Sequence, residues 1–215
     1  MIKIFRDPVS GLSHLAAAVG AGFGLVGLLW LGRDSVEKEI SLLVYGLSLI
    51  GMLSASAAYH LIQSNPAGIQ RLRKLDHSAI YLLIAGSYTP ICLHFFGGFW
   101  HWGLLGIIWG MALVGIITKL FIINAPRWVS AGIYLLMGWL SILAVNEMVH
   151  TMPAGALVGL VAGGLFYTVG AVVYITKKLD FYPGVFGFHE VWHIFVILGC
   201  LSHFMVIAVY IASSF

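Results

Sequence analysis

The feature that most constrains this chain is a series of apolar segments, each about as long as a bilayer is thick. Hydrophobic residues make up 60% of the 215 residues and only 9% are charged, a composition typical of integral membrane proteins. One helical crossing needs about 20 apolar residues, and the sequence contains seven such segments. They are approximately Leu12–Leu31, Ser41–Gln63, His77–Phe96, Trp102–Ile123, Trp128–Val149, Ala154–Thr176 and Gly187–Ile211.

These segments predict an all-α, polytopic fold, with one seven-helix membrane domain comprising residues 1–215. The connections are too short to contain a soluble domain. The first segment follows basic residues, as a secretory signal does, but its apolar run is too long for a cleaved leader and six more segments follow. Cys92 and Cys200 fall within predicted spans, which favours small core residues over a disulfide or a thiolate metal site.

The distribution of basic residues predicts the orientation, because cytoplasmic connections are enriched in lysine and arginine. Nine of the 11 lie in the N-terminal segment and in the connections on the same side, whereas Arg33 and Lys38 lie on the other side. We therefore expect the N-terminus in the cytoplasm and the C-terminus outside. The net charge of +3 reflects this asymmetry and gives no indication of nucleic-acid binding.

Two histidines spaced four residues apart, His189 and His193, lie at the start of the last apolar segment. Residues i and i+4 share a helical face, within reach of one metal ion. Ionisable groups inside a membrane are costly and usually functional. The second segment ends on the same side with Ser56 and His60, and the third begins there with Asp76. These five residues are therefore expected at one depth, near the cytoplasmic leaflet, on three helices.

Three imidazoles with an open fourth position are typical of a catalytic zinc site. Zinc would lower the pKa of its water to about 7 and supply a metal-bound hydroxide. Asp76 could accept the proton of that water, and Ser56 could hydrogen-bond to the water or to Asp76. The alternative is that each histidine only hydrogen-bonds to a neighbouring helix.

The same segment also matches the HExxH signature, in which the glutamate is the general base of a zinc protease. Glu190 points about 100° away from His189 on a helix, so it could instead face a neighbouring helix or the headgroups. Without a soluble domain to hold a polypeptide, a protease is disfavoured. His14, near the cytoplasmic end of the first segment, is a further candidate to support the site.

Three groups of residues resemble the bacterial hemolysin III family: Ser56-x-x-x-His60, the segment from Asp76 to Pro90, and His189-x-x-x-His193. That family is related to the progestin and adipoQ receptors and, more distantly, to the alkaline ceramidases. The resemblance extends over nearly the whole chain. It implies a seven-helix bundle in the bacterial cytoplasmic (inner) membrane, with zinc on the three histidines.

The resemblance also implies that Asp76 and Ser56 lie near the zinc-bound water. Glu190 departs from the family pattern, which weakens a protease-type role for it.

The leading hypothesis is a zinc-dependent hydrolase that acts on an amide or ester of a membrane lipid. The alternative is a sensor or regulator of membrane lipid state, in which a lipid binds the bundle and zinc is structural. A pore-forming hemolysin is disfavoured by the basic asymmetry, which is typical of a resident inner-membrane protein, and by the expected lack of a secretion signal. A proton-coupled transporter is disfavoured because the intramembrane acids do not form a chain across the bilayer.

Overall fold

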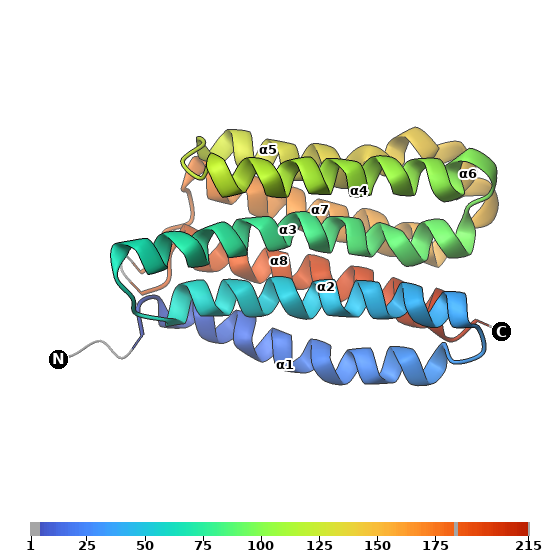
Figure 1. Ribbon diagram of the computed structural model, residues 1–215, viewed down its shortest axis with the longest axis horizontal. Helices are drawn as coiled ribbons and strands as arrows, with labels where there is room; N and C mark the ends of the chain where they lie inside the picture. Colours follow the sequence, from blue (N-terminus) through green and yellow to red (C-terminus); the bar gives the residue numbers. More distant parts are fainter. Residues whose placement is uncertain (1–4, 183–184, 215) are drawn as a thin grey trace.

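The computed structural model describes residues 5–182 and 185–214, which form a bundle of helices that cross in alternating directions (Figure 1). Among the described residues, seven helices are long and apolar enough to span a bilayer, which confirms the predicted all-α fold. In chain order the elements are α1 (Pro8–Leu31), α2 (Val36–Leu61), α3 (Pro66–Phe95), α4 (Gly98–Phe121), α5 (Arg127–Gly138), η1 (Trp139–Ala144), α6 (Val145–Thr151), α7 (Ala154–Thr176), α8 (Phe188–Ile207) and η2 (Ala208–Ala212).

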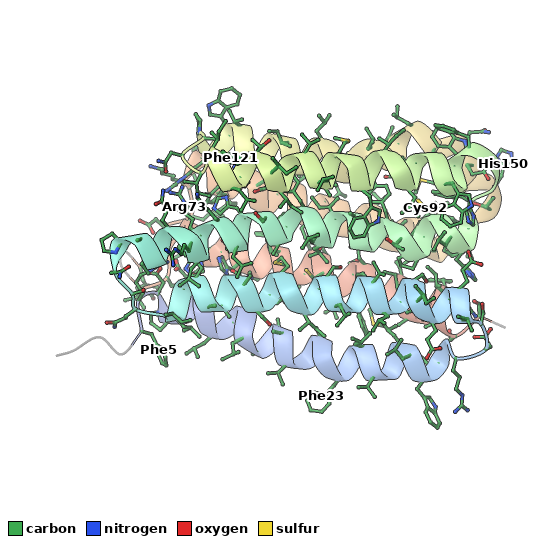
Figure 2. The ribbon with its side chains drawn as sticks, viewed as in Figure 1. Phe5, Phe23, Arg73, Cys92, Phe121 and His150 are labelled. Atoms are coloured by element: carbon green, nitrogen blue, oxygen red, sulfur yellow. The ribbon has the colours of Figure 1, made fainter. Side chains whose placement is uncertain are left out.

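The two ends of the bundle differ in charge. The start of α1 and the α2–α3, α4–α5 and α7–α8 connections lie together at the end where Figure 2 labels Arg73, which we call the basic end. Arg33 and Lys38, in and after the α1–α2 connection, lie at the opposite end, as does His150 in Figure 2. Lys3, counted among the basic residues above, lies outside the described residues. That the basic end faces the cytoplasm stays a prediction.

Helix α3 begins well before the predicted boundary at His77, because its first turns are polar. The side chain of Asn65 accepts a hydrogen bond from the Gly68 amide at 2.8 Å, and Pro66 occupies the first helical position, two features that favour a helix start. The added turns carry Arg71, Arg73 and Lys74. Hydropathy measures only the part of a helix that is apolar, so it missed this extension beyond the span.

The fifth crossing is not one regular helix, since the 3₁₀ segment η1 separates α5 from α6. Such a change leaves backbone groups without α-helical partners, which is costly inside a bilayer. The Tyr88 hydroxyl of α3 compensates for it: it donates to the Gly138 carbonyl at 2.8 Å and accepts from the Ser141 amide at 2.8 Å. A side chain from α3 therefore supports the irregular crossing.

The outer surface of the bundle is apolar. Phe23 of α1 is 76% exposed and Phe121 of α4 is 81% exposed, and Figure 2 shows Phe23 projecting away from the bundle. A surface of this kind, around helices of this length, is suited to contact lipid chains. Cys92 and Cys200 are buried and unpaired, as expected for small core residues.

Candidate metal centre

The three predicted zinc ligands lie together at the basic end. His60 is in the last turn of α2, and His189 and His193 are in the first two turns of α8. The Nε2 atoms of His60 and His189 are 3.3 Å apart, and the His193 ring centre is 4.8 Å from each of the other two. Each histidine offers one nitrogen such that all three atoms lie within 4.8 Å of one another. These residues could therefore hold a metal ion.

One separation within the cluster matches the spacing of zinc ligands. A tetrahedral ion with Zn–N bonds of about 2.0–2.1 Å places its ligand nitrogens roughly 3.3–3.4 Å apart, and the two Nε2 atoms of His60 and His189 have this separation. Two facing nitrogen lone pairs repel each other unless a cation or a proton lies between them. The third ligand atom, from His193, lies within 4.8 Å of the other two.

Asp7, the residue before α1, contacts the first of these histidines. His60 Nδ1 donates a hydrogen bond to Asp7 Oδ2 at 3.1 Å, and Arg6 Nε donates to the same oxygen at 3.1 Å. Partial burial raises the pKa of Asp7, but the hydrogen bonds from His60 and Arg6 and the Arg6 charge outweigh it, so the pKa lies below its ordinary value of 3.8. Asp7 is therefore an anion at neutral pH.

Glu190 has a structural position rather than the position of a base. Its Oε2 accepts a hydrogen bond from the Gly187 amide at 2.9 Å, and its Oε1 accepts one from the Ser10 hydroxyl at 2.8 Å. The first contact caps the start of α8, because a glutamate at the third helical position commonly reaches back to the N-cap amide. The second ties α8 to α1. Both carboxylate oxygens are therefore engaged away from the three histidines.

We expect Glu190→Ala to lower stability without removing a bound metal. Loss of the cap and of the Ser10 hydrogen bond should cost about 1–2 kcal/mol in unfolding free energy. Thermal unfolding of the purified protein, together with its metal content, measures both effects. Glu190→Gln, which retains an acceptor oxygen, serves as the milder variant. Unchanged stability combined with lost turnover would instead indicate a chemical role for Glu190.

A fourth imidazole lies against the candidate metal centre. The His14 ring of α1 packs on the His193 ring, with ring centres 3.9 Å apart and a 31° angle between their planes. His14 is only 3% exposed, and neither of its ring nitrogens has a hydrogen-bond partner. His14 is not among the residues whose nitrogens converge, so it lies beside the candidate ligand set rather than in it.

Ser56 and Asp76 lie at the polar end of an elongated cavity of about 410 Å³, together with His14 and His193. Both are buried, and the Ser56 hydroxyl lies beside the Asp76 carboxylate, to which it can hydrogen-bond. From Asp76 to Ile91 the cavity extends about 22 Å along α3 at 1.5 Å per residue. The α3 residues that line it are Asp76, Ile80, Leu83, Ile84, Ser87, Tyr88 and Ile91. The cavity is thus polar beside the histidines and mainly apolar beyond them.

The sequence predicted only part of what α1 contributes, since it offered His14 as a supporting residue. Asp7 and Ser10 were missed, because their partners His60 and Glu190 are 53 and 180 residues away in the sequence. A pattern in the local sequence cannot indicate contacts between residues so far apart in the chain. The capping role of Glu190 did leave a signal, since a glutamate three residues after Gly187 matches a helix start.

The fold and the histidine cluster together define a class: seven-helix membrane proteins with a candidate metal centre at one end of the bundle. Within this class, the chain belongs to the family described as "Haemolysin-III related", whose profile matches residues 2–204. This confirms the family resemblance drawn from the three motifs.

Similar proteins include two bacterial relatives and one animal relative. The chain is 36% identical over 215 residues to "Hemolysin-3 homolog" of Bacillus subtilis (strain 168), an alignment that covers 98% of this chain and 96% of the relative. It is 37% identical over 179 residues to "Hemolysin-3" of Bacillus cereus, covering 83% and 78%. Identity to "Adiponectin receptor protein" of Drosophila melanogaster is 28% over 215 residues, covering 89% and 48%.

Proposed function

We propose that this protein is a zinc-dependent membrane hydrolase that cleaves an amide or ester bond of a membrane lipid. One observation carries the proposal: of three converging histidines, His193 lines a long and mainly apolar cavity together with a buried aspartate and a buried serine. The histidines would hold the ion. When bound, zinc would polarise a carbonyl group and lower the pKa of a nearby water.

Asp76 and Ser56 are the chain's own groups for proton transfer. A carboxylate next to the reacting groups can accept a proton and return it to the leaving group. The Ser56 hydroxyl beside it would orient that carboxylate by donating a hydrogen bond. His14 lines the same end of the cavity with both ring nitrogens unpartnered, so it would bind a polar group of the lipid near the cleaved bond.

The shape of the cavity supports a lipid substrate. Its volume of about 410 Å³ falls within the range of roughly 300–1,000 Å³ that is common for small-molecule sites. Three residues that line it, Ile142, Val149 and Val161, are also 55%, 61% and 48% exposed. An acyl chain could therefore enter from the bilayer between the fifth crossing and α7. With the basic end in the cytoplasm, the candidate metal centre would lie on the inner-leaflet side of the bacterial inner membrane, and the exposed cavity residues would lie towards the opposite end of the bundle.

A second candidate function is a receptor-like sensor of membrane lipids in which zinc is structural. The 28% identity to a protein named as an adiponectin receptor favours it. A sensor needs the same cavity and the same histidines, but it needs no proton transfer by Asp76. The two functions therefore differ in whether the bound lipid is cleaved.

Release of free fatty acid tests the proposal. Zinc-loaded protein would be placed in vesicles of phosphatidylethanolamine and phosphatidylglycerol, with and without an added ceramide, and released fatty acid would be measured by mass spectrometry. We expect release from an amide or an ester lipid that stops with a metal chelator and returns with zinc. If zinc-loaded protein binds fatty acid but releases none from either lipid class, the sensor function is favoured and the hydrolase proposal fails.

A further inference from the structure

Asp7 is joined to His60 by two contacts, one from its side chain and one from its main chain. The carboxylate accepts the hydrogen bond from His60 Nδ1 at 3.1 Å, and the Asp7 amide donates to the His60 carbonyl at 2.9 Å. We propose that Asp7 is a positioning residue of the metal centre, which holds His60 with Nε2 directed at the ion. This inference rests on the zinc site of the proposed function.

The hydrogen bond between His60 and Asp7 determines which nitrogen of His60 is free to bind a metal. A neutral imidazole carries one N–H, and an ionised carboxylate can only accept a hydrogen bond. The contact with Asp7 therefore places the proton of neutral His60 on Nδ1 and leaves the lone pair on Nε2. That Nε2 atom is the one 3.3 Å from His189 Nε2. A carboxylate behind a ligating histidine fixes its tautomer and ring orientation and raises its basicity as a ligand.

The surroundings of Asp7 argue against an ordinary capping role. Asp7 immediately precedes α1, yet its side chain makes no capping hydrogen bond to that helix. Instead, Oδ2 is held between His60 and Arg6, and the Arg6 guanidinium lies 4.2 Å from the centre of the Tyr59 ring. The carboxylate is thus fixed against the end of α2 that carries the ligand.

The exposure of the Asp7 side chain determines how much zinc affinity should be lost when Asp7 is replaced. The Asp7 side chain is 44% exposed, whereas that of His60 is 4% exposed. Replacing a residue that hydrogen-bonds to a metal ligand typically lowers metal affinity by about 10–100-fold. Because water reaches Asp7 and weakens its interaction with His60, we expect a loss near the lower end, about tenfold.

The experiment compares the zinc affinities of wild type, Asp7→Asn and Asp7→Ala at neutral pH, by competition with a chelator on the full-length protein. Asp34→Asn is the matched control, since Asp34 also lies just before a helix and pairs with a basic side chain, Lys38, but at the opposite end. Thermal unfolding is recorded with and without zinc. We expect about tenfold weaker binding for Asp7→Ala, a smaller loss for Asp7→Asn and none for Asp34→Asn.

A purely structural role would lower the unfolding temperature equally with and without zinc. A positioning role should mainly reduce the increase that zinc produces, because a ligand stabilises according to its affinity. Zinc binding by Asp7→Ala within about twofold of wild type would overturn the inference and leave the hydrolase proposal intact. Weakened binding in a protein that cleaves no lipid would support the inference while the hydrolase proposal fails. A wild type that binds no zinc would overturn both.

Discussion

Replacing His189 by alanine should remove the metal from the purified protein, whereas wild type should carry a single zinc ion per chain. His189 supplies one of three converging nitrogens, and its Nε2 atom faces that of His60 at 3.3 Å. Zinc sites with four protein ligands bind with about 10–16 kcal/mol, or roughly 3 kcal/mol per ligand. Losing one ligand would then weaken binding by about 100-fold. Elemental analysis of the detergent-purified protein measures the metal directly.

His203→Ala is the matched control for this experiment. His203 also lies on α8, but its Nε2 atom donates to the Leu160 carbonyl of α7 at 3.3 Å, so its loss should leave the zinc content unchanged. If wild type purified with ample zinc contains none, the histidines are better explained as contacts between helices. The His60–His189 pair would then be an ordinary N–H···N hydrogen bond, and the hydrolase proposal would lose its basis.

Asp76→Asn should reduce lipid cleavage by about 10²–10⁴-fold, the usual contribution of a proton-transferring side chain. Asparagine has nearly the same shape and still accepts a hydrogen bond from Ser56, but it cannot take up a proton at neutral pH. Asp76 is not one of the three residues that would hold zinc. The metal content and the unfolding temperature of the variant should therefore stay close to those of wild type. The measurement is the rate of fatty acid release at saturating zinc.

The same variant separates the two candidate functions. A sensor with a structural zinc needs no proton transfer, so lipid binding should survive in Asp76→Asn. Asp34→Asn, at the opposite end of the bundle, controls for the loss of a carboxylate as such. Full turnover by zinc-loaded Asp76→Asn would exclude Asp76 as the proton acceptor and with it the mechanism proposed above.

Much of the candidate site could be predicted, because its residues lie near the ends of helices. When successive helices alternate in direction, the end of α2, the start of α3 and the start of α8 must meet at the same end of the bundle. That argument placed His60, Asp76 and His189 at one depth. It gives no information on which face of each helix points inward, and so it could not assign the direction of Glu190.

The number of crossings, the alternation of their direction and the end of the bundle that carries the histidines were determined by the sequence alone. The physical reason is that hydrophobic length, basic residues and helical spacing are local properties of the chain. The order of helices around the bundle and their rotation depend on side-chain packing between distant segments. Only the tertiary structure therefore showed which contacts α1 makes at the site, with Asp7 on His60 and His14 on His193.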